Sequence, residues 1–431
     1  MGSLAFAASE LADRIFLGRH SESALAASLP GSMMASTFTV LLIAMIGYSG
    51  TFVAQFHGAG EKSKSVAALA QGLWLALFAL PLFIAFIPIG NLLIGFNGHA
   101  PPVQADERTY FVSYVFVGFF SLISTVLGGY FSGLGRTRLV GVATAIGCAV
   151  NIGLDSILIS GLDLGIAGSG IASTASFVTS AAILAAVALR DPVLRDHARS
   201  QMLGFHPALA LRILKFGFPF GLSSLLANGT FALFTNVLGH FSSTVLAACN
   251  ASFAIHTVIF YVLAALSGAT RIKIGQLRGA NDFNSIHRCL LVSLSLACTI
   301  TLVIFLVILI RPPLILGLFA SDPAPSASFL SIGTKFLVLM LFRDLLEAMQ
   351  LVYTNALRAV GDTTFVLLAR TITSVLVWTP AFLLAARASS PVWTWLTMPL
   401  AFAIHTAILS IRWHRGNWET IEIIRSSSNC R

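Results

Sequence analysis

The sequence predicts an all-α membrane protein with twelve transmembrane helices in two pseudo-symmetric six-helix bundles, which are parallel repeats. Of the 431 residues, 56% are hydrophobic and only 10% are charged, whereas soluble globular chains carry roughly 25% charged residues. The mean hydropathy is +0.87. The apolar residues form repeated blocks of about 20, the length that crosses a hydrocarbon core of about 30 Å. This composition excludes a soluble enzyme and a disordered chain.

The predicted spans are defined by the length of the apolar blocks and the breaks between them, because each block is apolar on nearly every face. The second, third, ninth and tenth blocks exceed the minimum length, which indicates tilt or extension into the cytosol. No block shows the alternating pattern of a membrane β-barrel strand. The twelve spans are expected near residues 3–19, 29–55, 66–95, 108–132, 139–160, 166–189, 211–238, 245–270, 289–319, 328–357, 363–387 and 392–412.

Lysine and arginine are distributed unevenly between the two sides of the predicted membrane. Numbered from the amino terminus, the even connections and the carboxyl-terminal tail hold nineteen of them, Arg358 and Arg370 included, whereas the odd connections hold four. Cytoplasmic loops accumulate basic residues, so we expect both termini in the cytoplasm and the chain in the plasma membrane, the inner membrane in a bacterium. The net charge of +9 therefore reports topology. It does not indicate nucleic-acid binding, which requires basic residues clustered on one face.

The longest polar stretch, Arg190–His206, divides the chain into two halves that resemble each other. Six spans per half give both halves the same topology, so we expect parallel repeats related by an axis along the membrane normal. The expected lobes are residues 1–190 and 211–415, joined by a cytoplasmic linker at 191–210 and followed by a tail at 416–431. Identical residues recur at an offset of 221, among them Gln55, Gly58 and Ala59 with Gln276, Gly279 and Ala280.

Two parallel six-helix repeats favour a secondary transporter that works by alternating access. The chain has no GxxxxGK[ST] nucleotide loop, so the energy source is expected to be an ion gradient. No HExxH motif, nucleophile elbow or filter-like loop indicates an enzyme or a channel. The five cysteines are scattered without CxxC or metal-ligand spacing. We therefore expect no enzyme activity, cofactor, metal site or disulfide.

Ionisable residues within the spans are the candidates for the coupling site, because charge inside a membrane is expensive and usually functional. Asp155 lies about 24 Å along the fifth span at 1.5 Å per residue, and Asp13 lies late in the first, so both fall in the outer half. Asn151 shares a helix face with Asp155, and Ser173 lies at a similar depth in the sixth span. Paired carboxylates with an amide and a hydroxyl can bind a proton or Na⁺.

Structural interpretations stand beside these functional ones. Asp13 can be an interfacial residue paired with Arg14, and Asp155 with Asn151 can form a hydrogen bond between helices. In the tenth span, Arg343 and Glu347 are four residues apart and can form an intrahelical ion pair. Histidines such as His256 and His405 within spans are more typical of hydrogen-bonded packing than of proton transfer, and Lys335 is expected to point outward.

At these residues the sequence resembles the multidrug and toxin extrusion (MATE) family along essentially its whole length. ADRIFLGR surrounds Asp13 and is followed by ALAAS, and AQFHGAG stands at 54–60. The motifs GLGRTR at 133–138, NIGLD at 151–155, LISG at 158–161 and GIAGSGIAS at 165–173 follow in the first half, and EAMQ at 347–350 and ALRAVGDT at 356–363 in the second. Their order and spacing carry the resemblance.

The resemblance implies antiport, in which small organic and often cationic compounds leave in exchange for H⁺ or Na⁺. It places the cation site on Asp13, Asn151, Asp155 and Ser173, where many members have Thr in place of the serine. Glu347 matches an acid of one branch and marks a possible second site in the carboxyl-terminal lobe. That branch also carries an acid in the seventh span, near Ala227 and Asn228, which this chain lacks.

We expect the protein to be a monomer in the lipid bilayer and to bind no nucleic acid. The alternatives are a lipid-linked precursor flippase of the same superfamily and, from another class, a membrane-embedded enzyme or channel. Family members usually have a longer helix before the first-span acid, whereas only twelve residues precede Asp13 here. Either the first span is short or the natural start lies upstream of Met1.

Overall fold

The computed structural model describes residues 2–96, 100–202, 204–238, 243–317, 327–380, 383, 387 and 391–424. Helices account for nearly all of them, and no strand occurs in these ranges. The all-α prediction is confirmed. The end of the predicted eleventh span lies largely outside the described residues, as does Cys430.

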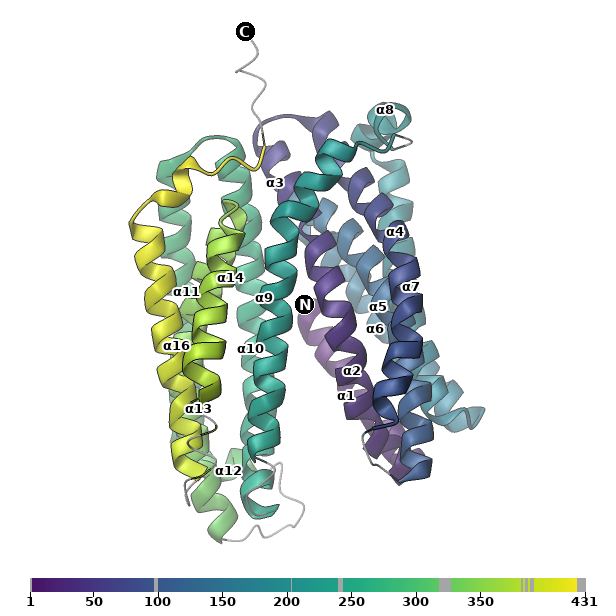
Figure 1. Cartoon of the computed structure of the whole chain (residues 1–431), viewed down its shortest axis with the longest axis vertical. Coiled ribbons are helices and arrows are strands. Elements are labelled where there is room, and N and C mark those ends of the chain that lie inside the picture. The colour runs from purple at the N-terminus through teal and green to yellow at the C-terminus, as the bar shows by residue number, and fades with distance from the viewer. Residues whose placement is uncertain are drawn as a thin grey trace. The chain divides into compact units, whose positions relative to one another are not determined.

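The first half of the chain contains the helices that carry the predicted ion site. They run side by side in Figure 1. Tyr48 separates the two helices of the second span. Their bounds are α1 (Gly2–His20), α2 (Glu22–Gly47), α3 (Ser49–Gly58), α4 (Lys62–Ile94), α5 (Pro101–Gly133), α6 (Thr137–Asp155), the π-helix η1 (Ser156–Gly161), α7 (Gly165–Arg190) and the short α8 (Pro192–Gln201).

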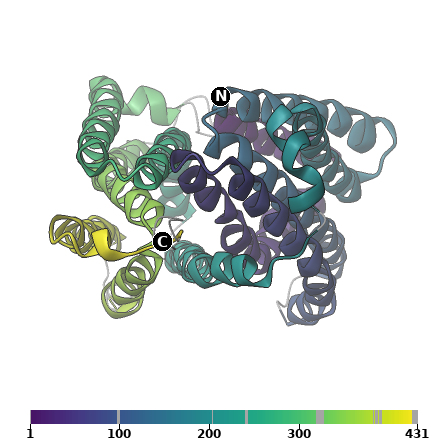
Figure 2. The same cartoon turned by 90° about the horizontal axis from the view of Figure 1, so that it is seen from above.

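The described residues of the second half form six long helical segments and two shorter pieces. Seen end-on, its helices form a bundle (Figure 2). The bounds are α9 (Pro207–Leu238), α10 (Ser243–Gly279), α11 (Phe283–Ile310), α12 (Pro312–Gly317), α13 (Ala327–Ala359), α14 (Thr363–Thr371), the π-helix η2 (Ile372–Trp378), α16 (Pro391–His414) and the 3₁₀-helix η3 (Asn417–Thr420).

Over its described residues, each of the twelve predicted spans coincides with a helix or a pair of consecutive helices. Within the described ranges, nine are long and apolar enough to cross a membrane. The other three are α1, α13 and the short Thr363–Trp378 segment. The helices α1 and α13 are less apolar because they carry the charged residues of the predicted sites, Asp13 in α1 and the Arg343–Glu347 stretch in α13.

Among the described residues, the outer faces of α4 and α11 are largely uncovered by protein. Only 22% of the most apolar window is buried inside the protein for α4, and the same holds for α11. Leu77 and Phe78 of α4 and Val303 of α11 are more than half exposed. Helices that are apolar on every face need lipid where protein does not cover them, which identifies a multi-pass membrane protein.

The chain forms two compact units. Unit 1 contains residues 1–224, 275–281 and 423–431, and unit 2 contains residues 225–274 and 282–422. In unit 1, α1 packs on α6, while α5 and α6 both pack on α7. In unit 2, α13 packs on α11 and α16. These packings bring together side chains that are far apart in the sequence.

The predicted linker docks on α4 and so belongs to unit 1. The amide of Gln71 donates to the carbonyl oxygen of Gly204 at 3.0 Å and accepts from the backbone N–H of His206 at 2.9 Å. Trp74 Nε1 donates to the carbonyl oxygen of Met202 at 3.3 Å. The polar backbone after α8 is thus satisfied by two α4 side chains.

One basic residue that was counted in a cytoplasmic connection lies inside a helix. Arg370, counted there with the cytoplasmic residues, lies within α14, seven residues after its start. Its Nε is buried. The predicted eleventh span, 363–387, already contains Arg370, so this residue does not belong with the connections and lies within a helix of unit 2.

Two glycines allow helices to cross closely within unit 1. A Cβ on Gly58, the last residue of α3, would lie 1.8 Å from the carbonyl oxygen of Gln276. A Cβ on Gly279, at the end of α10, would lie 1.9 Å from the carbonyl oxygen of Gln55. These residues are the pairs that recur at the 221-residue offset. The contact is reciprocal, since each glycine faces the glutamine of the other segment.

The substitution Gly279→Ala is expected to destabilise the protein by about 1–3 kcal/mol, as overpacking does, because the clash is with backbone that cannot rotate away. The measurement is the thermal unfolding midpoint of the purified protein in detergent. Gly268→Ala in the same helix is the matched control, since nothing lies within 4 Å of its Cβ position. Equal midpoints for the two variants would contradict the close crossing.

Candidate ion-binding sites

The four residues predicted for the first site lie together in unit 1, and three of them form a hydrogen-bonded chain. Asn151 Nδ2 donates to Ser173 Oγ at 3.4 Å, and Ser173 Oγ donates to Asp13 Oδ2 at 3.2 Å. The carboxyl of Asp155 interacts electrostatically with that of Asp13. All four residues are at least 92% buried. Side chains from α1, α6 and α7 thus form one polar cluster inside an apolar bundle.

Local helix geometry orients the acids. Asn151 and Asp155 are four residues apart in α6 and therefore share a face. Asp155 ends α6, and η1 follows at once with wider turns; the N–H of Leu162 donates to the oxygen of Ile157, five residues back, at 2.9 Å. Such π-helical turns occur frequently at functional sites. Here the change of helix type begins directly after the buried acid.

In the part of the chain that the structure describes, the cluster has unused acceptor atoms and no ion-pair partner of positive charge. Among the described residues, Asp13 Oδ1, Asn151 Oδ1 and both carboxylate oxygens of Asp155 are buried without a hydrogen-bond donor. Arg14 is not the counter-charge of Asp13, because it pairs with Glu10 at 3.0 Å. Two buried carboxyls without compensation are costly. A proton or a small hard cation would supply that compensation, since oxygen ligands suit such ions.

Two tyrosines next to this cluster were missed from the sequence. Tyr110 Oη donates to Tyr114 Oη at 3.0 Å, and both phenols lie within electrostatic range of Asp13. Tyr110 also packs with Leu17 and Ile159 in a small apolar group beside the site. The four-residue spacing of the tyrosines was a signal that they share a face of α5. Nothing in the sequence indicated that this face meets Asp13.

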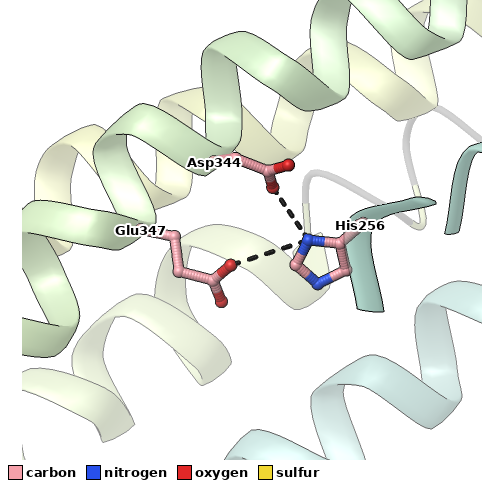
Figure 3. A group of neighbouring side chains, drawn as sticks. All are labelled: His256, Asp344 and Glu347. Carbon is pink, nitrogen blue, oxygen red and sulfur yellow. Dashed lines mark hydrogen bonds and ion pairs between the residues drawn. The ribbon is translucent and has the colours of Figure 1, made fainter. Parts of the chain in front are cut away.

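A second buried charged cluster lies in unit 2 (Figure 3). His256 of α10 points toward two acids of α13: its Nδ1 lies 2.8 Å from Asp344 Oδ1 and 3.8 Å from Glu347 Oε2. Arg343 Nη2 donates to Glu347 Oε1 at 2.9 Å, and its Nη1 donates to Asp344 Oδ1 at 3.2 Å. The guanidinium also lies over the Phe402 ring, 4.3 Å from its centroid.

The spacing of His256, Asp344 and Glu347 would suit a metal ion, since one ligand atom of each lies within 4.8 Å of the others. Arg343 provides positive charge to both carboxylates. Its Nη1 lies 3.1 and 3.2 Å from the two ring nitrogens of His256, the geometry of a group over the ring face. The residues therefore form an ion-pair network with a built-in cation, and they do not fit a metal centre.

Comparison with known proteins agrees with this architecture. The family model MatE matches residues 1–157 and 219–383, well over half of the chain. The probable multidrug resistance protein NorM of Pseudomonas aeruginosa is 27% identical over 424 residues, which cover 95% of this chain and 86% of that protein. The protein of the same name from Pseudomonas putida is 27% identical over 370 residues, which cover 83% and 79% of the two chains.

A solved structure has the same fold. An outward-facing multidrug resistance MATE family transporter of the MOP superfamily superposes with a TM-score of 0.87 over 99% of this chain and 94% of that chain, at 17% identity. Twelve predicted spans, two units of apolar helices and the match of the family model over both halves lead to one assignment. The chain belongs to the multidrug and toxin extrusion family, whose members are membrane transporters and not enzymes.

Proposed function

We propose that the protein exports small organic compounds, cationic ones among them, in exchange for H⁺ or Na⁺. The relatives that match over most of their length are named as probable multidrug resistance proteins, which supports an efflux function. The transport cycle alternates access between lobes 1–190 and 211–415, which the linker at 191–210 connects. The protein acts as a monomer in the plasma membrane, with both termini and the tail at 416–431 in the cytoplasm.

The observation that carries the proposal is the pair of buried acids, for which the described residues provide no counter-charge. Asp13 and Asp155 interact across the α1–α6 packing, next to Asn151 and Ser173, and have free acceptor oxygens among the described residues. A proton on one carboxyl, or Na⁺ between them, removes the repulsion between the acids. The packing of α1 on α6 then depends on whether the ion is bound.

Coupling follows from that dependence. An ion shifts an equilibrium between two conformations only through its different affinity for them. If α1 packs differently with and without the ion, and one packing leaves less room for substrate, the ion and the substrate compete. Binding of one then drives release of the other, which is antiport. The positive charge of Arg343 makes the unit 2 cluster the weaker candidate for binding the coupling ion. Glu347 is therefore proposed only as a second site.

Transport in reconstituted vesicles tests the proposal. The vesicles are loaded with a fluorescent organic cation, and a pH gradient and a Na⁺ gradient are imposed and collapsed separately with selective ionophores. We expect efflux that stops when one of the two gradients is collapsed, and that gradient identifies the coupling ion. Efflux at the same rate without either gradient would exclude ion-coupled antiport.

A further inference from the structure

A small cavity lies inside unit 2 between α13, α14 with η2, and α16. The space between the atoms that line the cavity is about 190 Å³, and part of it is open to the outside. The part that a water-sized molecule can enter has room for about one such molecule. Most of its lining is polar or aromatic: Gln350, Arg370, Thr373, Trp378, Phe402 and His405. Most of the cavity surface is apolar, and its polar groups come from Gln350, Arg370, Thr373 and His405.

The hydrogen bonds of His405 fix which side of its ring faces the cavity. Its Nδ1 lies 2.7 Å from Thr373 Oγ1. The Thr373 hydroxyl lies within donating distance of two backbone carbonyl oxygens, that of Ala369 at 2.9 Å and that of Arg370 at 3.2 Å. With the hydroxyl proton on one of these carbonyls, Nδ1 of His405 carries the proton of the Thr373–His405 contact. The other nitrogen, Nε2, is buried without a partner in the described part of the chain. A neutral His405 thus presents a bare acceptor.

The charge at this cavity is positive. Arg370 has a buried Nε–H without an acceptor and no carboxylate within ion-pair distance among the described residues. Two charged residues of α13 interact electrostatically with Arg370, namely Glu347 and Arg343. These two are already paired with each other. Two cations interact electrostatically with His405, Arg370 of α14 and Arg358 of α13. A cation with an unused donor in a low-dielectric interior calls for an anion.

We propose that this cavity binds a small monovalent anion, chloride or a small carboxylate, together with a proton on His405. The anion accepts from Arg370 Nε–H and neutralises its charge. The lone pair of a neutral His405 would repel the anion, whereas protonation turns Nε2 into a second donor. Anion and proton therefore favour each other's binding, by a coupling that is necessarily reciprocal.

The test is binding of chloride to the purified protein in detergent, with gluconate replacing chloride at constant ionic strength. The readouts are the thermal unfolding midpoint and the tryptophan fluorescence, since Trp378 lines the cavity. When one proton enters with each anion, affinity rises about tenfold for each pH unit lowered. No transport is measured, so the result is independent of the proposed efflux function. Affinity that does not change with pH would overturn the linkage.

Two variants test the contributions of Arg370 and His405 to anion binding separately. Arg370→Gln is expected to abolish chloride binding. His405→Gln, whose amide donates but does not titrate, is expected to retain weaker binding without the pH dependence, and it serves as the second test if Arg370→Gln does not fold. Arg311→Gln, at the exposed end of α11, is the control and should bind like the parent protein. Binding of equal affinity in the Arg370 and Arg311 variants would show that the cavity holds only water.

Competing anions identify the class of ligand. Formate displacing chloride would show that the site accepts a carboxylate, whereas chloride binding unaffected by formate would restrict it to a halide; both support an anion site. Sulfate is larger than chloride or formate and doubly charged, so it should not compete. Sulfate that stabilises the protein as well as chloride does, in both the parent and the Arg370 variant, would place the effect outside this cavity.

Discussion

Ion-driven efflux is expected to fall at least about tenfold in Asp13→Asn, and likewise in Asp155→Asn, which corresponds to about 1.4 kcal/mol or more of lost coupling. An asparagine keeps the shape and one acceptor but takes up no proton and offers no negative charge to Na⁺. The two acids interact with each other, so either substitution removes the shared charge. The measurement is the initial efflux rate from vesicles under the coupling gradient.

Asp163→Asn is the matched control for this result. Its side chain is 90% exposed and its only described partner is His20. Its backbone has a positive φ of 56°, a conformation that asparagine also adopts readily. We expect unchanged efflux in this variant. Full ion-driven efflux in both the Asp13 and the Asp155 variants would remove these residues from the coupling site.

The second large effect is expected at Arg343, where substitution by glutamine leaves Asp344 and Glu347 buried without their cation. Removing one partner of a buried ion pair typically destabilises a protein by about 3–5 kcal/mol, because the remaining charge is uncompensated. Arg343 is only 4% exposed, so water does not replace the lost partner. The measurement is the thermal midpoint and the yield of folded protein in detergent.

A second substitution separates loss of charge balance from loss of packing. Adding Glu347→Gln to Arg343→Gln restores the balance and should recover part of the lost stability. Lys335→Gln is the control, because Lys335 lies on the same helix but is exposed. An unchanged midpoint in Arg343→Gln, or a double variant less stable than the sum of the single effects, would contradict the ion-pair network.

Much of the fold follows from the sequence because charge is so scarce in it. The apolar blocks located all twelve helical segments, and the few acids inside them located the residues that cluster in unit 1. Helix rise alone placed Asp13 and Asp155 at a common depth. Depth is a property of one helix at a time, so it can be read from the sequence.

Which helix faces which could not be read in the same way. Tyr114 near Asp13, and His256 beside Asp344, depend on packing between segments 88 or more residues apart. Periodicity gives no face in a helix that is apolar all round. The π-helical turns after Asp155 and at Thr373 were also not predicted from the sequence.

The reciprocal glycine crossing has a consequence for the history of the chain. In an interface between two identical subunits, residue i contacts j and residue j contacts i, so every contact occurs twice. Gly58 against Gln276 and Gly279 against Gln55 show this double contact inside one polypeptide. It is the pattern of an isologous dimer whose subunits were fused after gene duplication. Each position on one side of the crossing therefore has an equivalent position on the other side.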